Sequence, residues 1–126
     1  MTSVSIPVSI GELYDKVSIL EIKKRKLEGK SLLNVEKELE LLFGILQGLD
    51  IQIDNELLDQ LRLVNSTLWD IEDQIRDHEH NNDFGKEFTE LARSVYLQND
   101  RRASIKRMIN QLTRSDIVEE KSYRSY

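Results

Sequence analysis

The stretch SVYLQNDRRASIK (Ser94 to Lys106) places side chains that can bind a ligand on the apolar stripe of an expected helix. The stripe runs up to Val95 and resumes at Ile105. An amide on such a stripe gives directional hydrogen bonds, and a guanidinium gives a fixed positive charge. The polar residues that interrupt the stripe are Gln98, Asn99 and Arg102.

Two interpretations of this interruption stay open. The first is a layer of buried amides that fixes the register or oligomeric state of the helices; replacing Asn65 and Asn99 together by leucine would then stabilise the fold. The second is a small helical enzyme or ligand-binding protein with a polar pocket between helices, around Asn65, Asn99 and Arg102. We favour the first. The candidate binding residues are Asn65, Gln98, Asn99, Arg102 and Lys106.

A second candidate site lies in LWDIEDQIRDHE, residues 68–79. Trp69, Asp73 and Arg76 share one flank of an expected helix, and paired carboxylates there can bind a divalent ion or exchange protons. Salt bridges on a solvated helix face have the same spacing and are far more common. We therefore rank this site second.

No residue pattern specifies a catalytic centre. His78 and His80 are two positions apart, and no third ligand stands at a useful spacing, so we expect no metal site. No glycine-rich phosphate loop and no nucleophile elbow occur, so the sequence indicates no cofactor and no catalytic residue. Whether the protein is an enzyme stays open.

The first two expected helices are short. Residues 1–8 alternate apolar and polar side chains around Pro7, which predicts an extended arm or a short edge strand. The first helix begins at Ser9, with Glu12 completing a capping box, and ends at Gly29. The second helix runs from Asn34 to Gly48, and its broad apolar stripe predicts burial on two sides.

The last two expected helices are long. A cap at Asp54 opens the third, whose apolar residues repeat without a break at steps of four and three. The turn after it is polar and short, so the fourth helix should fold back antiparallel, as far as Arg114. Partner positions then sum to about 164, which places Asn99 beside Asn65. The repeating residues are Leu57, Leu61, Val64, Leu68, Ile71 and Ile75.

These elements predict one all-α domain, a helical bundle built on a long antiparallel hairpin. It comprises the arm (1–8), the bundle (9–114) and a tail (115–126). In the tail, Lys121, Tyr123 and Tyr126 either fold over the bundle or form a free end. Two shorter helices cannot cover both long ones, so the uncovered apolar stripe predicts a homodimer.

Composition limits the partners and the cellular location that we expect. Charged residues make up 33% of the 126 residues, and the net charge of −5 makes nucleic acid an unlikely partner. The sequence has no run of 18 apolar residues and no signal peptide, so we expect no membrane association and a cytoplasmic location. A small-molecule ligand stays possible.

Four segments carry a family resemblance: VSIGELYDKVSILEIK, LWDIEDQIRD, FTELARSVYLQNDRRASIK and IVEEKSY. From Val8 to Tyr123 the chain resembles a small family of helical proteins from bacteria and phages, catalogued as a domain of unknown function. The resemblance implies no activity, substrate or catalytic residue. The expected function is therefore that of a non-enzymatic helical assembly or interaction protein.

Overall fold

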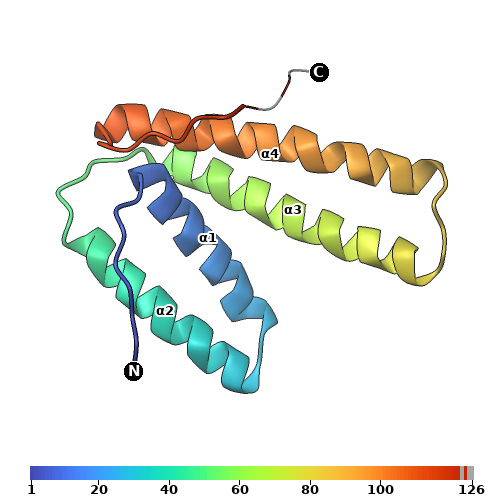
Figure 1. Ribbon diagram of the computed structural model, residues 1–126, viewed down its shortest axis with the longest axis horizontal. Helices are drawn as coiled ribbons and strands as arrows, with labels where there is room; N and C mark the ends of the chain where they lie inside the picture. The colour runs from blue at the N-terminus through green and yellow to red at the C-terminus, as the bar shows by residue number, and fades with distance from the viewer. Residues whose placement is uncertain (123, 125–126) are drawn as a thin grey trace.

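The computed structural model describes residues 1–122 and 124, and its regular elements are four α-helices (Figure 1). They are α1 (Ile10–Lys26), α2 (Gly29–Gln47), α3 (Asn55–His80) and α4 (Lys86–Thr113). No strand occurs among the described residues, and the expected all-α fold is confirmed. Of the tail residues singled out above, Tyr123 and Tyr126 lie outside the described residues.

Helices α3 and α4 form the predicted antiparallel hairpin (Figure 1). They contain 26 and 28 residues, which correspond to about 39 and 42 Å of helix. Asp54 caps α3 as predicted, because its Oδ1 accepts a hydrogen bond from the backbone N–H of Glu56 at 2.9 Å. The turn between the helices passes through Asn82 with φ at 51°, a left-handed conformation that asparagine tolerates better than most residues.

The hydrophobic core lies at the end of the hairpin where α1 crosses it. Leu61 and Ile109 are almost fully buried there, and burial of each such side chain stabilises the fold by about 1.5–3 kcal/mol. Beyond α1, over residues 66–98, the hairpin consists of α3 and α4 alone. Within this range Ile71 is the one buried residue. The buried cluster consists of Leu57, Leu61, Val64, Ile105 and Ile109.

Helix α1 crosses α4 at a point of close backbone contact. A Cβ atom on Gly11 would lie 2.7 Å from the backbone oxygen of Lys106 and 2.9 Å from Oδ1 of Asn110. Real Cβ atoms do not come this close to a backbone oxygen, so glycine is required here. A hydrogen bond of 2.7 Å from the Gly11 N–H to Asn110 Oδ1 joins the two helices at this contact.

Both ends of the first connection differ from the prediction. Helix α1 ends at Lys26, and Gly29 begins α2 instead of ending α1. The reason is that Leu27 and Glu28 are extended, which turns the chain, and that Gly29 then takes a φ of 63°. Helix α2 consequently starts five residues before the expected Asn34.

The expected burial of α2 on two sides is wrong. The backbone of α2 comes close only to that of α1, and Val35 is its only buried residue. The predicted stripe does face α1: its Leu39, Leu42 and Leu46 are half-buried. The residues that broaden the stripe, Leu41, Phe43 and Ile45, are exposed. Neither α3 nor α4 lies against Leu41 and Ile45, and Phe43 lines an open hollow that α2 shares with α1 and α3.

The two ends of the chain behave differently. Residues 1–8 form an extended, exposed arm that passes α2, with no strand pairing (Figure 1). The tail, here residues 115–122, reverses direction at Arg114, whose φ is 54°, and runs back along α4 (Figure 1). None of the helices in the described chain combines the length and apolar character that a membrane span needs.

Candidate functional site

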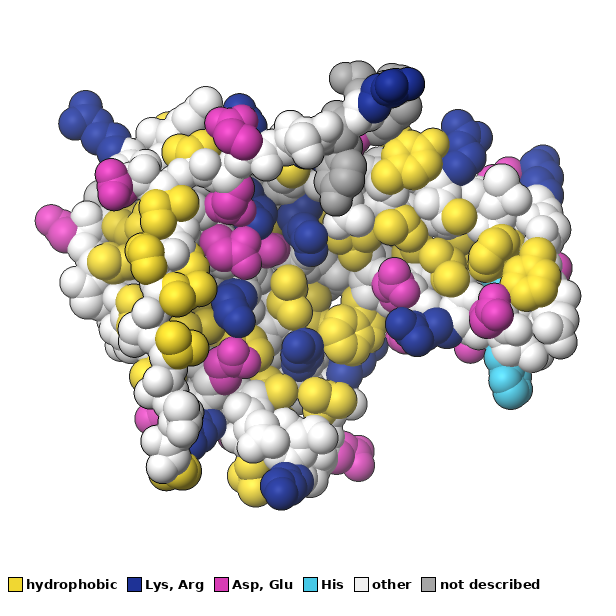
Figure 2. All heavy atoms as spheres, viewed as in Figure 1, with side chains coloured by type: hydrophobic (Ala, Val, Ile, Leu, Met, Phe, Trp, Pro, Cys, Tyr) yellow, Lys and Arg dark blue, Asp and Glu magenta, His cyan; other side chains and the backbone are white. Residues whose placement is uncertain are grey.

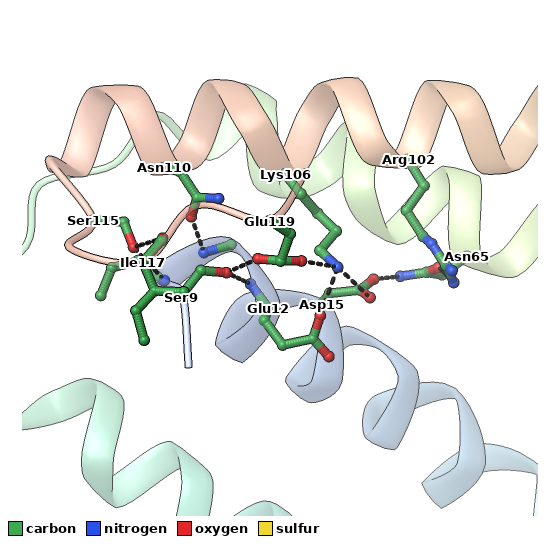
Figure 3. A network of polar contacts seen from close by, with 12 residues as sticks. Ser9, Glu12, Asp15, Asn65, Arg102, Lys106, Asn110, Ser115, Ile117 and Glu119 are labelled. Carbon is green, nitrogen blue, oxygen red and sulfur yellow. Dashed lines mark hydrogen bonds and ion pairs between the residues drawn. The ribbon is translucent and has the colours of Figure 1, made fainter. Parts of the chain in front are cut away.

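Polar side chains from three helices and the tail meet where α1 crosses the hairpin (Figure 3). On α1, the buried residues Gly11, Asp15, Ser18 and Ile22 follow steps of four and three, so that a small and polar stripe faces α3 and α4. We call the whole set the polar network. Its members are Ser9, Glu12, Asp15, Ser18, Asn65, Arg102, Lys106, Asn110, Ser115 and Glu119.

Lys106 lies at the centre of the polar network, and only 14% of its side chain is exposed. Its Nζ is 2.6 Å from Oε2 of Glu12, 2.9 Å from Oε2 of Glu119 and 3.7 Å from Oδ2 of Asp15. Burial alone would lower the pKa of Lys106, but its hydrogen bonds with Glu119 and Glu12 outweigh burial and raise that pKa above its usual value. Lys106 therefore stays a cation at neutral pH and is a poor general base or nucleophile.

Asn65 is buried and connects α3 to α1. Its Nδ2 donates hydrogen bonds to Oδ1 of Asp15 at 2.8 Å and to Oγ of Ser18 at 3.0 Å. Its Oδ1 accepts a longer hydrogen bond of 3.5 Å from Nη1 of Arg102. Asn65 is therefore part of an inter-helix layer, as predicted from the sequence, and its partners are a carboxylate, a hydroxyl and a guanidinium.

The predicted pairing of Asn65 with Asn99 does not form. Asn65 faces Arg102, so the positions sum to 167, about one helical turn from the expected register. Asn99 and Gln98 are half-buried, and neither makes a side-chain hydrogen bond with any described residue. The register is set by the contacts of α1 with both long helices, which the hairpin alone does not reveal.

The tail closes the polar network at the start of α1 (Figure 3). Ser9 accepts a hydrogen bond from the N–H of Glu12 at 3.0 Å, which is the predicted half of the capping box, and donates its hydroxyl proton to Glu119. The other predicted half is wrong, because the Glu12 carboxylate binds Lys106 instead. Oγ of Ser115 accepts a hydrogen bond from the N–H of Ile10 at 3.0 Å.

This arrangement positions helices more than it prepares chemistry. Within the described residues, every buried side-chain nitrogen or oxygen has a hydrogen-bond partner. Lys106 stands among three carboxylates, and Arg102 contacts the amide of Asn65. The Ser9 hydroxyl donates to Glu119, but the lowered pKa of that carboxyl makes it a weak base for activating a nucleophile. The polar network thus joins α1, α3, α4 and the tail, which is a structural task.

A groove lies beside the polar network, between α4 and the tail. Its volume is about 980 Å³, and its lining includes Asn99, Arg102 and Lys106 from the predicted site. Asn65 does not line it, because that side chain is enclosed by α1. The sequence-predicted residues are therefore divided between an enclosed layer and an open groove.

The second candidate site has the character of a solvated helix face. Asp73 and Arg76 are exposed, Trp69 is half-buried, and Nε of Arg76 is 3.8 Å from Oε2 of Glu72. Nearby, Nδ1 of His78 is 3.1 Å from the backbone oxygen of Asp83 and so connects α3 to the turn. Among the described residues, no three His, Cys, Asp or Glu side chains are grouped as a metal ion requires.

Sequence reasoning missed several members of the polar network. Asp15 and Ser18 gave a signal, since they interrupt the apolar residues of α1 at helical spacing; on α4, Asn110 continues the four-residue row of Arg102 and Lys106. Glu119 gave none, because an extended tail has no periodicity that indicates what it contacts.

The charge of Glu119 gives the network a testable pH dependence. Burial alone would raise the pKa of Glu119, but hydrogen bonds from Lys106 and Ser9 outweigh burial and lower it below its usual value. A lowered carboxyl pKa stabilises the fold above the unfolded value of about 4.3, and this stabilisation is lost as the pH falls through the lower folded pKa. We expect the melting temperature of the wild type to drop on acidification below about pH 4 by more than that of Glu119→Gln. Parallel melting curves from neutral to acid pH measure this, and equal acid sensitivity would refute it.

The model of a family of unknown function, DUF6165, matches residues 4–126. No curated protein and no solved structure matches the chain.

Proposed function

The chain belongs to the DUF6165 family of unknown function, and from that premise we propose that it is a non-enzymatic helical assembly protein that acts as a homodimer. The observation that carries this proposal is the outward face of α2. This face is opposite α1 and carries Leu33, Leu41, Gly44 and Ile45, with Lys37 between Leu33 and Leu41.

The outward face carries large apolar side chains, and no other helix of the described chain packs against it. Leu41 is 66% exposed and Leu33 is 67% exposed, although each is a large aliphatic side chain. Figure 2 shows hydrophobic side chains gathered over the N-terminal arm and α2. A clustered apolar surface of this kind marks an interaction site on a soluble protein.

Gly44 supports the same conclusion from backbone energetics. A Cβ atom on Gly44 would meet no atom within 4 Å, so no contact among the described residues requires glycine there. Glycine in the middle of a helix costs about 1 kcal/mol relative to alanine. A second helix lying close against this face would explain the missing side chain.

A second copy of the chain fits this surface. In a twofold contact the same patch meets itself. Two antiparallel α2 helices place Leu41 of one copy on Ile45 of the other, and again with the copies reversed, with Gly44 between the two contacts. Lys37 lies on the same face, one helical turn before Leu41, and Glu38 lies at its rim, where it is 3.5 Å from Lys16 of α1.

The polar network favours a non-enzymatic role. Lys106 is held as a cation among carboxylates, and the buried polar atoms of the described residues are all paired, which suits a structural connection. We propose the cytoplasm as the compartment, because a chain with 33% charged residues suits an aqueous environment.

Mass measurement of a charged variant tests the dimer. We expect the wild type to sediment as a dimer of a 14.8 kDa chain and Leu41→Lys/Ile45→Lys as a monomer, because four lysines would meet in the twofold contact. Leu112→Lys is the matched control: Leu112 is 62% exposed on α4, and its replacement should leave the dimer intact. Sedimentation velocity measures all three, and a monomeric wild type or an unaffected double variant would refute the proposal.

The groove beside α4 supports a second candidate function, ligand binding or a small helical enzyme. Its volume of about 980 Å³ reaches the upper range of small-molecule sites, and Arg102, Asn99 and Lys106 offer it charge and hydrogen bonds. Asn65 does not line the groove, but its Oδ1 accepts a hydrogen bond from Arg102 and would orient that guanidinium toward a ligand.

A further inference from the structure

The tail is held against the body by charges in a fixed order. Glu119 contacts Lys106 and Ser9. The next residue, Glu120, places Oε2 3.2 Å from Nη2 of Arg107, and Lys121 then pairs with Asp100. Three consecutive tail residues are thus matched by opposite charges or donors on α4 and at the start of α1.

The groups that receive Glu119 are already oriented by contacts that do not involve the tail. Ser9 is buried and accepts a hydrogen bond from the N–H of Glu12. Asn110 is buried and accepts one from the N–H of Gly11. Lys106 is held by Glu12. Because these contacts remain when the tail leaves, the site is preorganised for a carboxylate.

The surroundings of the site also suit an anion. Glu119 lies at the N-terminal end of α1, where the helix dipole favours negative charge. It receives the hydroxyl proton of Ser9 and lies 2.9 Å from Nζ of Lys106. The side-chain amide of Asn110 is close enough to help lower the pKa of this carboxyl. Two donors therefore contact the carboxylate, and the amide of Asn110 lies beside it.

Apart from these polar contacts, few interactions hold the tail against the helices. Val118 is 43% exposed, and no residue of the tail belongs to the buried core. Exposed ion pairs such as Arg107 with Glu120 contribute little to stability. A segment with few buried apolar contacts opens readily. The tail is therefore free to exchange with another segment of the same chemistry.

We propose that Ser9, Lys106 and Asn110 form a binding site for the glutamate side chain of an extended peptide, and that Glu119 of the chain's own tail occupies it as an internal ligand. The flanking contacts of Arg107 and Asp100 select a peptide over a free carboxylate, because they bind the two residues that follow the glutamate. This site lies within one chain and does not depend on the contact between α2 helices.

The test removes the internal ligand and supplies an external one. In full-length Glu119→Ala the site keeps its donors but loses its carboxylate, so we expect a lower melting temperature than in the wild type. Adding a synthetic peptide of residues 115–122, SDIVEEKS, should restore that temperature and show saturable binding by calorimetry. The same peptide with glutamine at position 119 should bind at least about tenfold more weakly, because a hydrogen bond to a charged group is lost.

Two controls separate this site from general charge effects. Full-length Glu120→Ala loses a neighbouring carboxylate whose partner Arg107 is half exposed, and the peptide should not raise its melting temperature. Acetate is the free-carboxylate probe for Glu119→Ala. Restoration by acetate but not by the peptide would overturn the peptide assignment, and restoration by neither would overturn the site. The oligomeric state is measured separately by sedimentation velocity. Failure of the peptide to bind is therefore distinct from failure of the chain to dimerise through α2.

Discussion

Replacement of Lys106 by methionine is expected to lower the free energy of unfolding by about 3 kcal/mol, because it removes the cation shared by three carboxylates. Methionine keeps the apolar stem but has no charge. Asp15 is buried, so its charge would lose a counter-ion that water cannot replace. Glu12 and Glu119 are partly exposed and would recover some hydration, which keeps the loss at the lower end of the range for broken buried pairs.

Urea unfolding of Lys106→Met measures this change. Lys86→Met is the matched control, since Lys86 also pairs with a glutamate, Glu90, but lies on an exposed face of α4. We expect no measurable change in that control. If Lys106→Met were as stable as the wild type, the polar network would not hold α1 against the hairpin.

Replacement of Asn65 by leucine is expected to destabilise the fold by about 3 kcal/mol, because it leaves buried polar groups without their donors. Leucine has a similar volume, so packing changes little. Asp15 would lose its hydrogen bond of 2.8 Å and Ser18 its hydrogen bond of 3.0 Å. This expectation reverses the one drawn from the sequence, in which leucine at positions 65 and 99 stabilised the fold.

Asn99→Leu is the internal control for this result. Asn99 is half-buried beside the groove and makes no side-chain hydrogen bond with a described residue. Its replacement should change the free energy of unfolding by less than about 0.5 kcal/mol. Equal effects of the two substitutions, measured by urea unfolding, would mean that the contacts of Asn65 with α1 contribute nothing.

The positions of the helices could be predicted from the sequence better than the packing of each helix against the others. The unbroken repeat from Leu57 to Ile75 required a helix, and the short polar turn after it required an antiparallel partner, so the hairpin followed from local pattern. The apolar residues of α2 indicated that the helix would be buried, but not which segment would cover it. Leu41 and Ile45 lie on a face that no described segment covers, and apolarity alone does not distinguish a core from an interface.

The candidate site was predicted in part, for a similar reason. Arg102 interrupts the apolar stripe of α4 and Lys106 follows one turn later, so periodicity indicated both, whereas Asn65 was indicated by the expected pairing of the two long helices. Their partners Asp15 and Glu119 come from α1 and the tail. Asp15 is 50 positions from Asn65, and Glu119 is 110 positions from Ser9, which it also binds. Which distant segment reaches a polar side chain depends on tertiary packing, and a single sequence does not encode that in any local spacing.

Two adjacent amides at the start of α1 have partners in different parts of the chain. The Ile10 N–H donates to Ser115 of the tail, whereas the Gly11 N–H donates to Asn110 of α4. Detachment of the tail therefore frees the first amide proton for exchange with solvent, while the second is released only when the two helices separate. Two consecutive peptide units thus report two different motions: hydrogen exchange at Ile10 follows release of the tail, and exchange at Gly11 follows separation of α1 from α4.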